Sequence, residues 1–221
     1  MGRRCRCGIW AVLGVLVSIT GPPSARAGQP VELAVTGRDG RPLDGVVLYL
    51  PDVRTPTTRS PAVIDQRDEA FLPVVSVVTA GSEVQFTNSD RTSHHVYSFS
   101  RPNAFALPLY KGDARLSARF QHPGVVVLGC NIHDSMLGYV VVVDSTRYGT
   151  TGSDGHLKLA DVPAGRHVVR AWAPGLDREH HPEVGSVEVS ESAPAIASFS
   201  LDLAGSAGAG KAGGSLVGRD Y

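Results

Sequence analysis

Apolar residues in this 221-residue chain occur in short runs, which glycine, proline and other turn-forming residues interrupt every few positions. Many of these runs alternate apolar and polar side chains, which is typical of strands with one buried face. No segment shows the period of an amphipathic helix. Short strands between regular turn signals predict an all-β protein built from sandwiches or barrels. The predicted strands are 31–35, 46–50, 62–65, 74–79, 83–87, 96–100, 124–128, 139–143, 157–159, 167–172, 186–189 and 196–203.

Residues 1–27 have the features of a secretion signal. Three arginines near the N-terminus precede an apolar run over 8–20, and a small-x-small cleavage site ends at Ala27. The apolar run is too short to cross a bilayer, so no membrane span is expected. We therefore expect a signal peptide over 1–27, its removal, and a mature protein in the periplasm.

The mature chain is close to neutral and poor in sulfur. Four of the 21 basic residues and none of the 21 acidic ones lie in 1–27, which leaves 17 basic and 21 acidic residues. This balance lacks the basic footprint of a nucleic-acid-binding protein. One cysteine, Cys130, and one methionine, Met136, remain, so no disulfide can form within the chain. A lone thiol in an oxidising compartment requires a specific role.

Cys130, His133 and Met136 place a thiol, an imidazole and a thioether within one seven-residue segment between two predicted strands. A short loop between adjacent strands can turn all three side chains toward one point. A further imidazole, that of His94 or His95, lies upstream of this loop. One thiolate, two imidazoles and a weak, distant thioether form the ligand set of a blue-copper site, whereas structural zinc sites seldom use a thioether. Cys130, His133, Met136 and one upstream histidine are therefore predicted to bind one type 1 copper ion.

The cysteine loop resembles that of cupredoxins, and its C-x-x-H-x-x-M spacing is similar to that of amicyanin. In this family an asparagine usually lies six residues before the first histidine ligand, and an apolar residue lies two after it. Asn88 and Val96 have these positions relative to His94, and Gly138 matches the close of the loop. The resemblance covers roughly 62–146 and implies a Greek-key sandwich that transfers electrons. The whole chain also resembles bacterial periplasmic proteins labelled "methylamine utilization protein".

His95 is an alternative to His94 as the first histidine ligand. The spacing from Asn88 favours His94, whereas strand alternation places His95 on the same face as Tyr97, which would be the core side. Cupredoxins often have asparagine after the first histidine ligand and proline before the second, where this chain has His95 and Ile132. These departures affect the surroundings of the ligands and the reduction potential more than the ligand set.

The remaining histidines are not expected to form a second metal site. His122 begins a strand, and His156 and His167 lie in or beside turns. His180 and His181 are expected in a solvated loop.

Residues 147–203 form short strands separated by turns at 153–155 and 163–165. This pattern resembles the carboxypeptidase-regulatory or transthyretin-like sandwich, except that the two opening strands of such domains are missing. A matching pair of strands, expected to form a hairpin, lies in 28–51. The resemblance implies a discontinuous Ig-like sandwich of 28–51 and 147–203, into which the cupredoxin domain of 61–146 is inserted. The alternative is that the first two strands are a hairpin of the cupredoxin domain.

Two segments, 51–61 and 144–149, are expected to link the two sandwiches. Residues 204–221 are rich in glycine, alanine and serine and cannot bury enough apolar surface to offset their ordering entropy, so a flexible tail is predicted. Trp172 lies in a predicted strand, which favours core packing over stacking on a sugar.

The leading interpretation is a periplasmic, non-enzymatic electron carrier that exchanges electrons with a redox protein, such as a cytochrome c or a periplasmic dehydrogenase. One alternative is a Cu(I) carrier or storage protein, which would be expected to contain more than one cysteine and one methionine. A second is a noncatalytic interaction module with a carbohydrate-binding-like sandwich, although no residue supports a sugar site. An enzyme would need a further cluster for substrate or dioxygen, and the sequence shows none.

Overall fold

The computed structural model describes residues 28–54, 61–176 and 181–203. This part of the chain contains sixteen strands and no helix, so the predicted all-β fold class is confirmed. Within it, no helix is long and apolar enough to cross a membrane. The predicted signal peptide (1–27) and tail (204–221) lie outside the described residues.

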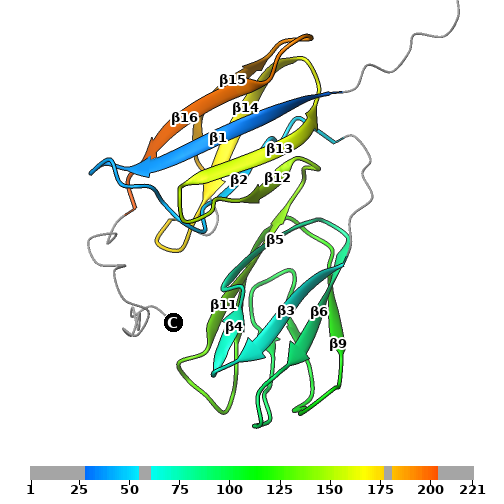
Figure 1. Cartoon of the computed structure of the whole chain (residues 1–221). Helices are drawn as coiled ribbons and strands as arrows, with labels where there is room; N and C mark the ends of the chain where they lie inside the picture. The colour runs from blue at the N-terminus through cyan, green and yellow to red at the C-terminus, as the bar shows by residue number, and fades with distance from the viewer. Residues whose placement is uncertain (1–27, 55–60, 177–180, 204–221) are drawn as a thin grey trace, which may run out of the picture.

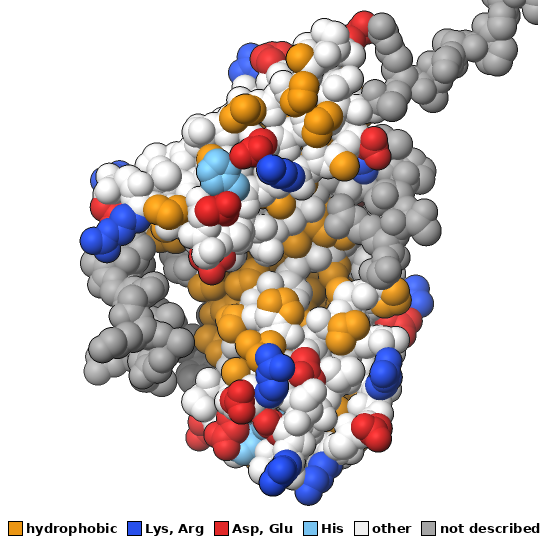
Figure 2. Space-filling model, in the orientation of Figure 1, with side chains coloured by type: hydrophobic (Ala, Val, Ile, Leu, Met, Phe, Trp, Pro, Cys, Tyr) orange, Lys and Arg blue, Asp and Glu red, His pale blue; other side chains and the backbone are white. Residues whose placement is uncertain are grey.

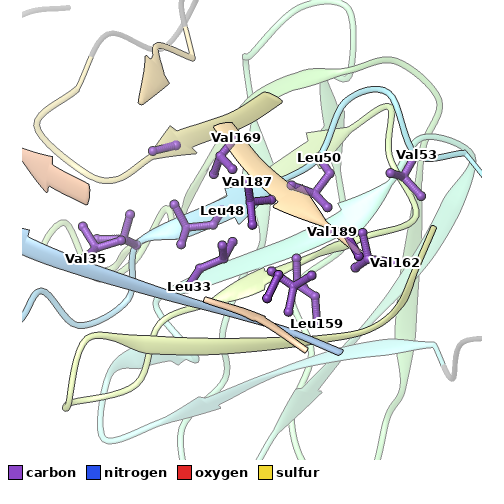
Figure 3. Close-up of a cluster of buried hydrophobic side chains, with 14 of the residues drawn as sticks. Leu33, Val35, Leu48, Leu50, Val53, Leu159, Val162, Val169, Val187 and Val189 are labelled. Atoms are coloured by element: carbon purple, nitrogen blue, oxygen red, sulfur yellow. The ribbon is translucent and has the colours of Figure 1, made fainter. Parts of the chain in front are cut away.

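The upper sandwich in Figure 1 consists of a three-stranded sheet that packs on a four-stranded sheet, in the orders β13-β1-β16 and β12-β2-β14-β15. Its strands come from both ends of the chain. Leu33, Leu48 and Val169 are fully buried between the two sheets (Figure 3). The strands are β1 (Gln29–Gly37), β2 (Val47–Tyr49), β12 (Tyr148–Thr150), β13 (His156–Val162), β14 (Gly165–Trp172), β15 (Glu183–Val189) and β16 (Ala195–Leu201).

The lower sandwich is formed by the central part of the chain, with sheets in the orders β4-β3-β6-β9 and β5-β11-β10-β7-β8 (Figure 1). Its core contains Ile64, Phe86 and Val140, together with Cys130 and Met136. The candidate ligand loop is therefore rooted in the core of this sandwich. The strands are β3 (Ala62–Arg67), β4 (Ala70–Leu72), β5 (Val75–Thr79), β6 (Ser82–Asn88), β7 (Tyr97–Ser98), β8 (Phe105–Ala106), β9 (Leu116–Phe120), β10 (Gly124–Gly129) and β11 (Leu137–Val143).

The predicted hairpin of the first two strands is wrong. β1 pairs antiparallel with β13 and parallel with β16, so both of its edges are occupied. β2 pairs with β12 and β14 in the facing sheet. The side chains of β2 are buried on both faces, whereas β1 alternates buried and half-buried positions. The chain therefore crosses from one sheet to the other between these strands.

The two segments that connect the sandwiches, 50–53 and 145–147, lie side by side where they join the upper sandwich. The Leu50 amide donates to the Arg147 carbonyl (2.9 Å), and the Thr146 amide donates to the Val53 carbonyl (2.9 Å). The Ser145 hydroxyl donates to the Leu50 carbonyl (2.7 Å). Parts of both predicted linkers are thus packed, since Val53 and Ser145 are buried. These contacts support our proposal that the domain of 61–146 is inserted between β2 and β12.

A third cluster of buried side chains lies between the two sandwiches. It contains Tyr49 of β2 and Trp172 of β14 from the upper sandwich, and Val141 and Val143 of β11 from the lower one. Trp172 is 1% exposed, so it packs in the interior as its strand context predicts. Figure 2 shows hydrophobic side chains gathered at this waist of the molecule. Apolar burial therefore fixes the two sandwiches to each other.

We expect the fragment 147–203 to be unfolded or aggregated by itself, because it lacks β1 and β2, which are interior strands of their two sheets. Joining 28–51 to 147–203 through a short Gly/Ser linker should restore a cooperative thermal melt by circular dichroism. A cooperative melt of 147–203 alone would refute the proposed insertion.

Candidate metal centre

The loop between β10 and β11 is short and tightly folded. β10 ends at Gly129 and β11 begins at Leu137, so the seven residues between them carry Cys130, His133 and Met136. The Met136 amide donates to the His133 carbonyl (3.0 Å), which closes a turn. Cys130 and Met136 are each 3% exposed. The loop thus directs its two sulfur-containing side chains into the core.

His94 lies between β6 and β7 and is fully buried. Its amide and carbonyl pair with the carbonyl and amide of Tyr110, at 2.9 and 3.0 Å. The Asn88 side chain shapes the preceding loop, because it donates to the Thr92 carbonyl (3.0 Å) and the Tyr110 carbonyl (3.1 Å) and accepts from the Asp90 amide (2.9 Å). The asparagine six residues before His94 therefore has a visible structural role.

The structure brings His94, Cys130 and His133 together. Their candidate ligand atoms all lie within 4.8 Å of one another. The Cys130 Sγ is 3.9 Å from His94 Nδ1 and 3.8 Å from His133 Nδ1. A thiolate and an imidazole that share one metal ion in a trigonal arrangement lie roughly 3.7 Å apart, given metal–ligand distances of about 2.3 and 2.0 Å. The three side chains therefore fit a common metal ion, and one thiol with two imidazoles suits copper.

His95 lies outside this cluster. Its backbone amide donates to Cys130 Sγ at 3.4 Å, whereas its ring packs against Tyr97 with a centroid distance of 5.7 Å. Spacing from Asn88 thus selected the histidine that faces Cys130. Simple strand alternation did not, because β7 starts only at Tyr97. Met136 is buried in the same core cluster as Cys130.

Asp90 is the main support of His94. Its Oδ2 lies 2.7 Å from His94 Nε2, and the carboxylate also accepts the backbone amides of Asp68 (2.7 Å) and Glu69 (3.1 Å). Burial acts to raise the pKa of Asp90, but the hydrogen bonds from the Glu69 amide, His94 and the Asp68 amide outweigh it and lower the pKa. An ionised Asp90 holds the proton of His94 on Nε2, which leaves the Nδ1 lone pair directed at the cluster.

Two further groups border the site. Glu69 Oε1 lies 3.8 Å from His133 Nε2, on the solvent side of the ring. Burial raises the pKa of Tyr110 to about 12, with the hydrogen bond from Gln66 opposing it. Tyr110 is therefore a neutral phenol beneath the site. Sequence patterns indicated neither Asp90 nor Tyr110, because their roles depend on contacts between separate loops.

The other described histidines form no second cluster of three metal-binding groups. His156 pairs with Glu32 at the surface, and His167 is buried on β14 beside Asp52 (2.6 Å). His181 lies in a loop as expected, but its side chain is half-buried, with its Nδ1 3.0 Å from the Tyr49 hydroxyl. Burial, and then the nearby Arg170 guanidinium, lower the pKa of His181. His180 lies outside the described residues.

No protein-family model matches the sequence, and no curated protein matches it significantly. Among solved structures, a purple cupredoxin from Nitrosopumilus maritimus is 22% identical, with a TM-score of 0.34 over 37% of this chain and 98% of that one. A variant of amicyanin in its reduced Cu(I) form at pH 4 is 22% identical, with a TM-score of 0.36 over 43% and 97%. A copper-containing nitrite reductase from Thermus scotoductus is 23% identical, with a TM-score of 0.37 over 50% and 28%. The function of the site is therefore inferred from its own residues.

We expect Asp90→Ala to destabilise the metal-free protein by about 1–3 kcal/mol, because the buried His94 ring and two turn amides lose their acceptor. Copper affinity should fall by about 10–100-fold, as is usual when a histidine ligand loses its outer support. Asp90→Asn retains an acceptor oxygen and should lose less of both. Thermal melts and copper titrations test this, with the exposed Asp134→Ala as control. Equal behaviour of Asp90→Ala and Asp134→Ala would contradict the assigned role.

Proposed function

We propose that the chain binds one copper ion in a type 1 (blue) site and transfers single electrons in the periplasm, without turnover of a substrate. His94, Cys130 and His133 would be the strong ligands, and Met136 the weak axial ligand. The proposal depends on one observation: a thiol and two imidazole Nδ1 atoms converge within 4.8 Å of one another. This donor set, completed by a distant thioether, is that of blue-copper proteins.

Copper bound here would supply one-electron chemistry by cycling between Cu(I) and Cu(II). The residues of the chain would hold the ligands in place. Asp90 fixes the tautomer and orientation of His94 through Nε2. The His95 amide donates to the Cys130 sulfur, which stabilises negative charge on a thiolate. Because His94 and Cys130 are restrained by the protein itself, the ligand positions would change little between the two oxidation states.

The burial of the ligands favours electron transfer over catalysis. His94 is fully buried and Cys130 is 3% exposed, so a substrate has no direct approach to either. The side chain of His133 is 19% exposed and brings the ligand set closest to solvent. Catalytic metal sites keep an open position for substrate, whereas a metal held by these buried side chains would be shielded from one. Its partner would be another redox protein, such as a cytochrome c or a periplasmic dehydrogenase.

A Cu(I) storage function has less support. Storage requires many soft ligands, and the described residues contain one cysteine and one methionine, both in a single loop. The buried Trp172 also gives no support to sugar binding by the upper sandwich.

Cys130→Ser is expected to abolish the intense thiolate-to-copper absorption band and most of the Cu(II) affinity, because a serine hydroxyl is not ionised near neutral pH. The visible spectrum of the copper-loaded protein measures this directly. A colourless Cu(II) form of the unmodified protein would refute the type 1 assignment, and a coloured serine variant would remove Cys130 from the site.

His94→Ala should weaken the copper absorption band far more than His95→Ala, since of these two rings the His94 ring faces Cys130 Sγ. Copper titrations followed by visible absorption compare the two variants, and thermal melts control for folding. The reverse ranking would show that His95 is the ligand.

Met136→Leu should retain copper and raise the reduction potential, because a thioether donor favours Cu(II) over Cu(I). Leucine has a similar volume, so the loss of stability should stay below about 1.5 kcal/mol. Cyclic voltammetry of the copper-loaded variant tests this. An unchanged potential would mean that Met136 is only a packing residue.

A further inference from the structure

Three aromatic side chains form a row that starts beside Cys130 and ends in solvent. The rings of His95 and Tyr97 have a centroid distance of 5.7 Å, and those of Tyr97 and Phe99 a distance of 5.0 Å. The three residues alternate with the buried Val96 and Ser98, so they lie on the side of this segment that faces away from the core. Phe99 is 83% exposed.

The inner end of the row is in contact with the candidate metal centre. The His95 amide donates to Cys130 Sγ at 3.4 Å. Tyr97 pairs with Gly129, the residue before Cys130, and its ring lies over that glycine. A Cβ atom on Gly129 would be only 2.9 Å from the Tyr97 ring, so the ring occupies the space of a side chain. The row thus contacts the segment 129–130 through the His95 backbone amide and the Tyr97 ring.

The segment that follows Phe99 is basic, in contrast to the acidic excess of residues 28–221. Residues 97–115 contain three basic residues and one acidic residue, Asp113. The basic ones are exposed, and none makes an ion pair with another described residue. Acidic groups, by contrast, border the other side of the site, where Glu69 and Asp90 approach the histidines. The three basic residues are Arg101, Lys111 and Arg115.

We propose that His95, Tyr97 and Phe99 form an electron route from the Cys130 side of the copper site to a docking surface for an acidic one-electron redox protein. This inference rests on the proposed copper-binding function. Arg101, two residues after Phe99, would attract the acidic partner, and Phe99 would lie in the centre of the contact. One electron passes per encounter: the metal is oxidised from Cu(I) to Cu(II), and the partner's centre is reduced by one electron. No bond forms or breaks, and no proton moves.

Stopped-flow oxidation of the Cu(I)-loaded full chain tests the route, with hexacyanoferrate(III) as an anionic probe and tris(bipyridine)cobalt(III) as a cationic one. Phe99→Ala and Tyr97→Leu should each slow oxidation by hexacyanoferrate(III) several-fold, whereas Tyr97→Phe keeps the ring and the rate. Arg101→Glu should slow it by about tenfold at low salt, and the difference should disappear at high salt. The absorption spectrum and the reduction potential of the Phe99 and Arg101 variants should stay unchanged.

The matched control is Ile196→Ala, which removes another highly exposed apolar side chain (74%) from the upper sandwich. The route is refuted if Phe99→Ala and Arg101→Glu oxidise at the rate of this control. The route is also refuted if Ile132→Ala in the ligand loop slows oxidation by hexacyanoferrate(III) and Phe99→Ala does not. A chain that develops no blue band would instead refute the proposed function, before any kinetic comparison.

The docking surface can be tested without electron transfer. Titration of the metal-free, ¹⁵N-labelled chain with poly-L-glutamate, a redox-inert acidic polymer, should shift the amide signals of Phe99, Arg101 and Lys111 in a salt-sensitive manner. Arg101→Glu should weaken these shifts. Shifts confined to other surfaces, or none at low salt, would overturn the proposed docking site.

Discussion

A single carboxylate, that of Asp90, ties the candidate metal centre to the rest of its sandwich. Asp68 and Glu69 form the turn between β3 and β4 with positive φ angles of 53° and 55°. Such conformations cost non-glycine residues about 1–3 kcal/mol each. Both turn amides donate to Asp90, which also holds His94. Charge-assisted hydrogen bonds thus offset the turn strain and fix a ligand orientation at the same time.

The site also joins the two sheets of the lower sandwich. His94 follows β6 of the four-stranded sheet, whereas Cys130, His133 and Met136 lie between β10 and β11 of the five-stranded sheet. Cys130 and Met136 belong to the hydrophobic core that both sheets share. Because core packing fixes these side chains independently of any ion, the ligand geometry is a property of the fold. A rigid site of this kind would suit the one-electron transfer that we propose.

Sequence patterns predicted what depends on local order and missed what depends on distant contacts. Alternation located β1 and β6, a continuous apolar run located β11, and ligand spacing located the histidine that faces Cys130. The short strands β4, β8 and β12 have two or three residues each, too few for any alternation to be recognised. β9 alternates clearly in LSARF but lies in a segment of loop-like composition. The role of Asp90 depends on a turn more than twenty residues away, which no local pattern contains.

The upper sandwich covers only part of the outer face of the five-stranded sheet. The residues Tyr97, Gly129 and Tyr139 share the outer face of the five-stranded sheet, as their pairing across β7, β10 and β11 requires. At one end of this face, Tyr139 packs on Trp172 of the upper sandwich with a centroid distance of 5.3 Å. At the other end, Phe99 remains in solvent. The upper sandwich therefore covers the β5–β11 side and leaves the β7–β8 side, nearest to Cys130, accessible to a partner.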